Sequence, residues 1–139
     1  MNKEEHALIW FRADLRAQDN TALQVAADSG RTVIACFVVT PEQWREHDMA
    51  SIKARFIGQN VKILQQVLSN RGIPLKILNV PSFKQLPEAL LSLCQLCNVT
   101  SLFANHEYGV NEKRRDLCCT SLLEAHGFYS YFFDCMWAL

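Results

Sequence analysis

The sequence has no excess of charge of either sign. Its 139 residues include 14 Lys and Arg against 14 Asp and Glu, so the formal net charge at pH 7 is zero. A protein that binds the nucleic-acid backbone strongly normally presents a basic face, because Lys and Arg neutralise the phosphates. The charge balance therefore argues against a strong electrostatic grip on nucleic acid, while leaving room for a local basic patch.

Long hydrophobic runs are also missing. No apolar stretch approaches the roughly 20 residues that a membrane-spanning helix needs. Residues 1–6 are polar, and no apolar segment with a small-residue cleavage site follows them, as it would in a secretory signal. We therefore expect a soluble, cytoplasmic protein without a membrane partner.

The six cysteines lack the spacing of a metal site. Cys94 and Cys97 form a C-x-x-C, but the sequence has no second such pair and no H-x3-H. The pair lies in an apolar helical pattern, residues 90–97, which favours buried reduced thiols that behave as small hydrophobic side chains. The same interpretation applies to Cys118 and Cys119, and no metal site is predicted.

The glycine-rich phosphate loops of nucleotide-binding proteins are absent. No G-x-G-x-x-G follows the first apolar run, and no G-x4-G-K-[ST] occurs anywhere. No Ser/His/Asp or Cys/His set can be singled out by its spacing. An ordinary dinucleotide-dependent dehydrogenase is therefore disfavoured, and we predict no catalytic residue.

What the sequence does contain is a regular alternation of short apolar runs with longer amphipathic ones. The second run is apolar without interruption, which is typical of a strand in a sheet that is covered on both faces. The pattern predicts strands at 7–11, 32–39, 75–80, 100–104 and 128–133, and helices at 21–28, about 50–69, 82–96 and 111–125. This alternation predicts an α/β fold, a doubly wound five-stranded parallel sheet in the order 3-2-1-4-5, as one domain over residues 1–139.

Two details of the helices can also be predicted. Ser82 is expected to cap the helix that follows it. In the longest helix, one apolar stripe is expected to face the sheet, formed by Phe56, Val61, Leu64 and Leu68. Residues 135–139 are apolar and follow the last predicted strand directly. We interpret them as the sign of a chain cut from a longer protein, the alternative being a tail that packs back onto the domain.

The same topology predicts where a ligand would bind. In open doubly wound sheets, ligands lie beyond the carboxyl ends of the strands, where the strand order reverses. With the first strand between the second and the fourth, three polar loops meet there, residues 12–16, 40–48 and 105–112.

These loops have structural explanations as well as functional ones. Arg12, Asp14, Arg16 and Asp19 would hold the first turn by pairing with one another, and His47 would be a loop histidine without a role. Glu112 would stabilise the start of a helix through its interaction with the helix dipole.

Three segments resemble the photolyase and cryptochrome family. Residues 10–23 match the family's opening, W-F-R-x-D-L-R-x-x-D-N-x-A-L. Residues 40–49 resemble the T-P-x-Q-W-x-x-H-x-M of bacterial class I cyclobutane-dimer photolyases, and residues 103–116 resemble their F-x-N-x-x-Y-E-x-N-E-x-x-R-D. The segments occur in register over essentially the whole chain, which is therefore similar to the N-terminal α/β antenna domain of these enzymes.

The resemblance implies a function. Photolyases repair UV-induced cyclobutane pyrimidine dimers in DNA by light-driven electron transfer from reduced FAD, which is held with the UV-damaged DNA by a larger helical domain absent from this chain. In the folate-type members, methenyltetrahydrofolate is the antenna, and the residues that hold its pterin correspond here to His47, Asn111 and Glu112. A carboxylate can accept the pterin's paired N–H donors, and a neighbouring amide can both donate and accept. The chain alone is expected to be a catalytically inactive monomer.

Two departures and three alternatives accompany the resemblance. Gly109 stands where the family usually has an acidic residue, which we expect to free the backbone and loosen the site, and residues 134–139 match poorly. The alternatives are a cryptochrome-type blue-light receptor, a deazaflavin or FMN antenna inside the crevice, and a nucleotide-binding flavoprotein domain. The T-P-x-Q-W segment argues against the cryptochrome.

Overall fold

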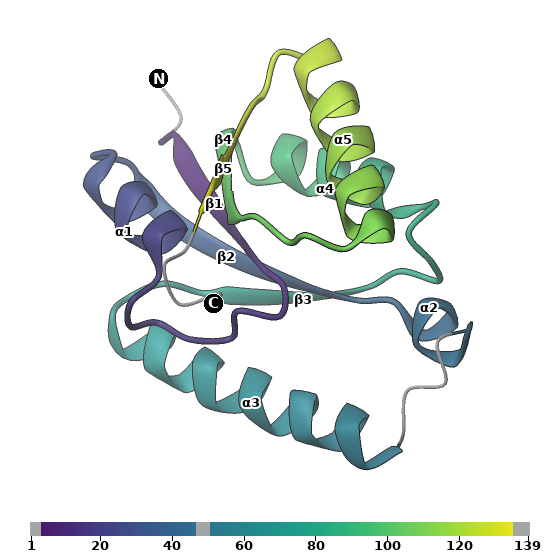
Figure 1. The fold of residues 1–139 in the computed structure, drawn as a ribbon. Helices are drawn as coiled ribbons and strands as arrows, with labels where there is room; N and C mark the ends of the chain where they lie inside the picture. The colour runs from purple at the N-terminus through teal and green to yellow at the C-terminus, as the bar shows by residue number, and fades with distance from the viewer. Residues whose placement is uncertain (1–3, 47–50, 135–139) are drawn as a thin grey trace.

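The predicted sheet is present. The structure, a computed structural model, describes residues 4–46 and 51–134. Five parallel strands form one sheet in the order β3-β2-β1-β4-β5 (Figure 1). The strands are β1 His6–Phe11, β2 Thr32–Val39, β3 Leu75–Asn79, β4 Val99–Asn105 and β5 Tyr129–Phe133. The fold class and the strand order are therefore confirmed, with strand ends within one residue of their predicted places.

The helices follow the predicted alternation, with one addition. They are α1 Thr21–Asp28, α2 Pro41–Glu46, α3 Ser51–Asn70, α4 Leu86–Leu96 and α5 Val110–Ala125. Helix α1 begins after Asn20, whose side chain accepts the backbone N–H of Leu23. Helix α5 ends before Gly127, whose φ of +84° suits a residue without a Cβ.

Three local predictions about the helices are wrong. Residues 41–46 form the short helix α2 instead of a loop, since Pro41 fits the first turn of a helix. Ser82 does not cap α4, because its hydroxyl contacts the Gln85 side chain in a turn before the helix begins. Phe56 is 61% exposed. It lies five residues before Val61, or about 140° around the helix at 3.6 residues per turn, and so leaves the buried stripe.

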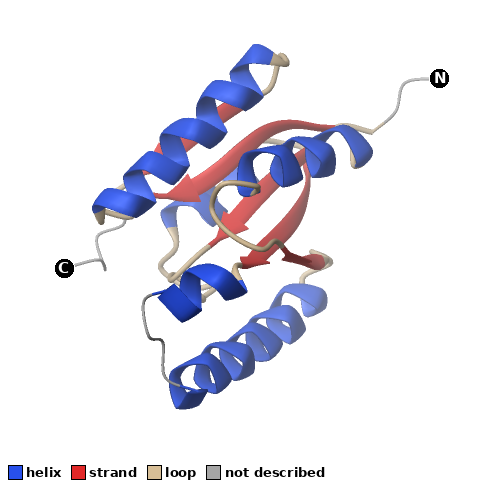
Figure 2. Cartoon of the chain, turned by 90° about the vertical axis from the view of Figure 1, so that its right-hand side faces the viewer, coloured by secondary structure: helices blue, strands red, loops and turns tan. Residues whose placement is uncertain are grey.

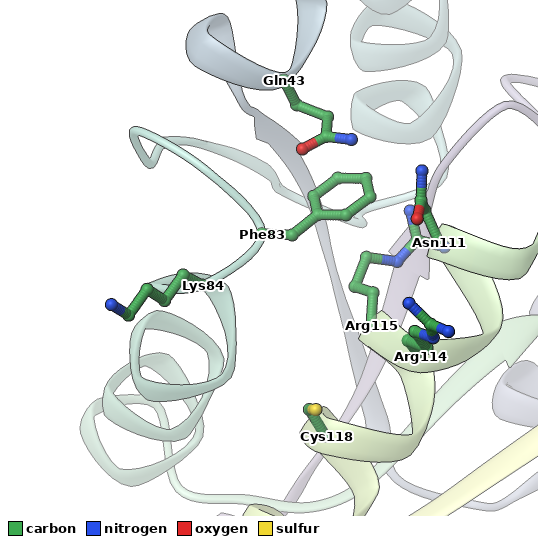
Figure 3. A pocket seen from close by; sticks show the side chains of 7 residues that line it. All are labelled: Gln43, Phe83, Lys84, Asn111, Arg114, Arg115 and Cys118. Atoms are coloured by element: carbon green, nitrogen blue, oxygen red, sulfur yellow. The ribbon is translucent and has the colours of Figure 1, made fainter. Parts of the chain in front are cut away.

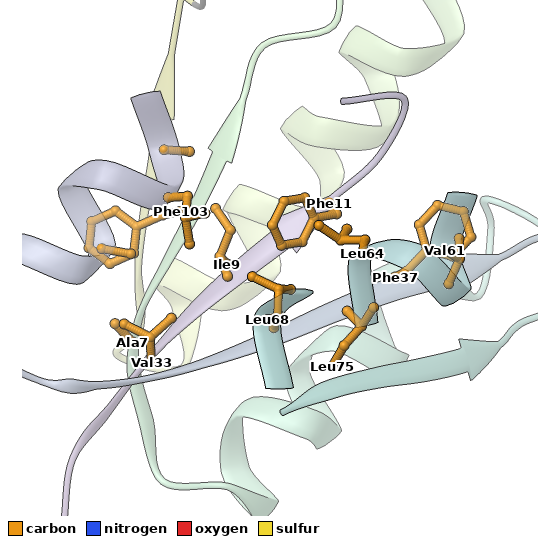
Figure 4. Packing of buried hydrophobic residues seen from close by; sticks show 14 residues of the cluster. Ala7, Ile9, Phe11, Val33, Phe37, Val61, Leu64, Leu68, Leu75 and Phe103 are labelled. Atoms are coloured by element: carbon orange, nitrogen blue, oxygen red, sulfur yellow. The ribbon is translucent and has the colours of Figure 1, made fainter. Parts of the chain in front are cut away.

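The sheet separates two hydrophobic cores. Alternate residues of β1 point to opposite faces, so that Ile9 and Phe11 pack against α1 and α3, while Leu8 and Trp10 pack against α4 and α5. Figure 2 shows helices on both sides of the sheet, and Figure 4 shows the α1 and α3 side, where Leu64 lies near Phe11. The central strands are therefore covered on both faces, as their uninterrupted apolar sequences predict.

The thiols mostly follow their predicted burial. Cys36, Cys94 and Cys119 are buried and free, and burial raises the pKa of Cys94 and of Cys119 to about 12. Cys97 is half-buried, and Cys118 is exposed on α5, so the prediction of a buried thiol is wrong for Cys118.

Two features are absent from residues 4–46 and 51–134. None of their helices is long and apolar enough to cross a membrane. They also contain no group of three or more His, Cys, Asp or Glu side chains placed to hold a metal ion.

Candidate functional site

The three predicted loops converge at the carboxyl ends of β1, β2 and β4. They surround a cavity of about 710 Å³ that Arg12, Trp44 and Glu107 line from the first, second and third loop, respectively. This cavity lies where the strand order reverses between β1 and β4. The predicted place of the site is therefore a real concavity in the structure.

A buried ion-pair network forms one wall of the cavity. Arg12 pairs with Asp116 at 2.7 Å, and Arg115 pairs with Glu107 at 2.6 Å and with Asp116 at 3.1 Å. The Arg12 and Arg115 side chains are only 4% and 6% exposed. The two cations and two anions neutralise one another, so the network joins the loop after β1, the loop after β4 and α5 without leaving an unpaired charge.

Trp10 packs against this network. The guanidinium carbon of Arg12 lies 4.5 Å from the centroid of the Trp10 ring, and that of Arg115 lies 5.1 Å from it. Burial lowers the pKa of Arg115, but the carboxylates of Asp116 and Glu107 more than offset this and raise the pKa overall. Arg115 is therefore a fixed cation in the wall of the cavity, with Arg12 beside it over the same ring.

The first loop is held by amide and carboxylate groups. Asp14 accepts the backbone N–H of Arg12 at 2.9 Å and the side-chain amides of Asn105 at 2.7 Å and Asn20 at 3.3 Å. Burial raises the pKa of Asp14, although the hydrogen bonds from the Arg12 backbone and the Asn105 side chain oppose the rise.

The four charged residues of this loop hold the turn only in part as predicted. Arg16 donates to the Asp19 carbonyl at 3.3 Å, but the Arg12 guanidinium turns away to Asp116. Arg12 therefore joins the loop to helix α5, and its predicted pairing within the turn is wrong.

The structure places two of the three predicted site residues. Glu112 is half-buried in the first turn of α5 and lines the 710 Å³ cavity as well as a neighbouring pocket of about 410 Å³. Asn111 is exposed and lines a different pocket of about 580 Å³ (Figure 3). His47 lies outside the described residues, while Gln43 and Trp44 on the preceding helix line the large cavity. Asn111 and Glu112 thus face adjoining hollows, and not a single pocket.

Gly109 has a different effect from the one expected. Its φ of −65° and ψ of 153° are ordinary for any residue, so the glycine frees no unusual backbone conformation. A Cβ at this position would instead collide with the Glu112 carboxylate, which lies folded over Gly109 at the start of α5. A carboxylate is stabilised there by the helix dipole. Gly109 therefore makes room for one particular position of the Glu112 side chain.

Arg115 and Asp116 have roles in the site that were not predicted from the sequence. Arg115, Cys119 and Leu123 are spaced four residues apart on the buried side of α5. Charged residues at the start of an otherwise buried stripe signal a buried ion pair, because an unpaired charge would be too costly there. The four-residue spacing of Arg115, Cys119 and Leu123 therefore indicates that Arg115 is buried, but it does not show which carboxylates pair with it.

The fold and the cavity define a doubly wound α/β domain with a ligand crevice at the point where the strand order reverses. Within that class, the model of the DNA photolyase family matches residues 7–136, and the chain belongs to this family. It is 39% identical over 127 residues to the deoxyribodipyrimidine photo-lyase of Vibrio cholerae, an alignment that covers 91% of this chain and 27% of that protein. It is 43% identical over 110 residues to that of Salmonella typhimurium, with 78% and 23% covered.

A solved structure supports the fold. The cryptochrome of Synechocystis sp. PCC6803 superposes with a TM-score of 0.85 at 20% sequence identity, over 96% of this chain and 28% of that one. At this identity the likeness concerns the fold alone. The chain spans about a quarter of the length of the relatives that it matches.

Proposed function

We propose that residues 1–139 form the light-harvesting domain of a deoxyribodipyrimidine photo-lyase. The observation that carries the proposal is the convergence of the three family-like loops around one cavity at the switch point of the sheet. The similarity to two proteins named deoxyribodipyrimidine photo-lyase, at 39% and 43% identity, favours this function over a cryptochrome-type light receptor.

Methenyltetrahydrofolate is the antenna that fits the donor and acceptor groups best. Glu112 faces the cavity and would accept the amino and ring N–H groups of the pterin as a bidentate pair. Asn111 is its neighbour on α5 and would donate and accept on the same edge, and His47 is the third residue that we propose for the pterin. When bound, the folate would absorb near-UV or blue light and pass the excitation to reduced FAD.

Repair itself requires more than this domain. FAD and the pocket for the pyrimidine dimer would belong to the part of the longer relatives that this chain does not span. The contribution of residues 1–139 would be to position the antenna, since the cofactors carry the chemistry. UV-damaged DNA would be contacted through that other part, and this chain alone would be catalytically inactive.

A flavin-type antenna inside the crevice is the second candidate. The 710 Å³ cavity has the size of a small-molecule site, and Trp10 and Phe37 are among the apolar residues that line it. A deazaflavin or FMN in this place would differ from a folate in its absorbance spectrum.

Titration of the chain with methenyltetrahydrofolate tests the first candidate. Loss of a charge-assisted hydrogen-bond pair costs roughly 1.5–3 kcal/mol, so Glu112→Ala should weaken binding about ten- to a hundred-fold. Glu124→Ala, which removes an exposed carboxylate farther along the same helix, is the matched control and should leave the affinity unchanged. Equal folate affinity of Glu112→Ala and the unmodified chain would leave Glu112 only its role at the helix start.

A further inference from the structure

Helix α3 carries an exposed apolar stripe on its outer side. Ile52 is 81% exposed, Phe56 61% and Ile63 62%. At 3.6 residues per turn these three positions fall within about 40° of one another, away from the buried Val61 and Leu64. Figure 1 shows α3 at the outside of the sheet, with no other described element beyond it. Ile52, Phe56 and Ile63 together are called the outer stripe below.

The outer stripe has the spacing of a coiled-coil seam. Seam positions follow one another in alternating steps of four and three residues, as do Ile52, Phe56, Gln59, Ile63 and Gln66. A helix of a second molecule matches such a seam, because its side chains interdigitate with positions spaced in this way. Phe56 also lines the large cavity, whereas Ile52 and Ile63 do not, so the stripe extends beyond the candidate site.

The positions that flank the outer stripe are cationic. Arg55 and Lys62 lie on one side of it and Lys53 on the other, and all three are exposed. Helix α3 contains no Asp or Glu, and none of its three cations forms an ion pair within residues 4–46 and 51–134. In coiled coils the flanking charges decide the choice of partner. A second copy of α3 would bring cations and no carboxylate to the seam, so a helix with acidic flanks fits better than self-association.

We propose that the outer side of α3 binds an acidic amphipathic helix of another protein. Apolar side chains of that helix would pack on the outer stripe, and its carboxylates would pair with Arg55 and Lys62 on one flank and Lys53 on the other. The inference goes beyond the proposed function and does not depend on a bound antenna. Because the flanking cations are exposed, the attraction should weaken as salt screens it, over a Debye length of about 10 Å at 0.1 M.

Titration calorimetry of the chain with two designed peptides tests the inference. The acidic peptide has about three heptads with Ile and Leu at the seam and Glu at the flanks, and the basic peptide has Lys in place of Glu. The chain should bind the acidic peptide and not the basic one. Phe56→Ala should weaken the acidic peptide about ten-fold, since it removes the largest apolar contact. Leu117→Ala, which removes an exposed apolar side chain of α5, is the matched control and should leave the affinity unchanged.

Charge reversal tests the pairing of the flanks. The double substitution Arg55→Glu and Lys62→Glu should abolish binding of the acidic peptide and allow the basic peptide to bind. Both side chains are exposed, so the fold should be kept, and circular dichroism checks this. The inference is wrong if the unmodified chain binds both peptides equally, or if the double substitution leaves the affinity for the acidic peptide unchanged.

Other occupants of the outer stripe would give different results. Binding to phosphatidylserine–phosphatidylcholine vesicles or to a short DNA duplex that is lost in Phe56→Ala, without binding of the acidic peptide, would overturn the inference. A full-length photo-lyase that contains this domain should also bind the acidic peptide. If it does not, the outer side of α3 is covered within the longer protein and the inference is wrong. None of these results changes the folate titration of Glu112→Ala, which tests the proposed function separately.

Discussion

At the scale of single residues, Gly109 controls where the Glu112 carboxylate rests. The carboxylate lies where a Cβ of residue 109 would stand, at the start of α5. The interaction of a carboxylate with a helix N-terminus stabilises this position of the side chain by about 0.3–1 kcal/mol. A pterin that binds the Glu112 carboxylate must offset this free energy. The glycine is therefore expected to weaken folate binding through the position of the Glu112 carboxylate, and not by loosening the loop.

Gly109→Ala should tighten folate binding by roughly two- to five-fold, because its Cβ displaces the Glu112 carboxylate from the helix N-terminus. The backbone angles at Gly109 suit alanine, so the fold should be kept. Fluorescence titration with methenyltetrahydrofolate measures the change. In a Glu112→Ala background the gain should vanish, since the two residues act through one contact. An equal gain in both backgrounds would show that Gly109 acts independently of Glu112.

The thiols give a second prediction at this scale. In a Cys135→Ser background, Ellman's reagent should modify the exposed Cys118 rapidly, whereas the buried Cys36, Cys94 and Cys119 should react only after unfolding in urea. Burial raises the pKa of Cys94 to about 12, so an increase from pH 7 to pH 9 should not activate it. Mass spectrometry of the labelled peptides identifies the sites. Labelling of Cys94 in the native chain at pH 9 would contradict its burial.

At the scale of elements, the buried network between the loop after β1 and α5 is the most sensitive connection. Asp116 bonds to both Arg12 and Arg115, and its removal leaves two buried guanidinium groups with one remaining carboxylate, Glu107. Asp116→Ala should therefore lower the free energy of unfolding by about 3–5 kcal/mol. Urea denaturation followed by circular dichroism measures this loss.

The same measurement needs a control on the same helix. Glu124→Ala removes an exposed carboxylate of α5 and should change the free energy of unfolding by less than about 0.5 kcal/mol. A comparable loss in both variants would mean that α5 depends on its total charge and not on the network.

Much of the element structure could be predicted because it depends on local patterns. Uninterrupted apolar runs locate the strands, and the glycine after α5 marks its end. The start of α4 and the exposure of Phe56 could not be predicted in this way. The Ser82 hydroxyl can cap a helix or bond to the Gln85 side chain, and the local sequence does not decide between the two. The face of α3 that is buried depends on where the helix meets the sheet, which leaves Phe56 exposed.

At the scale of the whole molecule, topology located the site better than single motifs did. The order of the strands brings three loops together, and this could be derived from the alternation of strands and helices. The network of Arg12, Arg115 and Asp116 joins residues more than a hundred positions apart, so no local pattern identifies its partners. No sequence pattern indicates that the neighbours Asn111 and Glu112 face different hollows.

The central claim is that Glu112 holds the antenna of a photolyase, and one measurement tests it most directly. A full-length photo-lyase that contains this domain would be purified as the Glu112→Ala and Glu112→Gln variants, and its absorbance spectrum and light-dependent repair would be recorded. Glu112→Ala should lose the folate band, retain FAD, and repair pyrimidine dimers more slowly only when light is limiting. Glu112→Gln should fall between, because an amide keeps one acceptor but sets one donor against another. An unchanged folate band in Glu112→Ala would contradict the account.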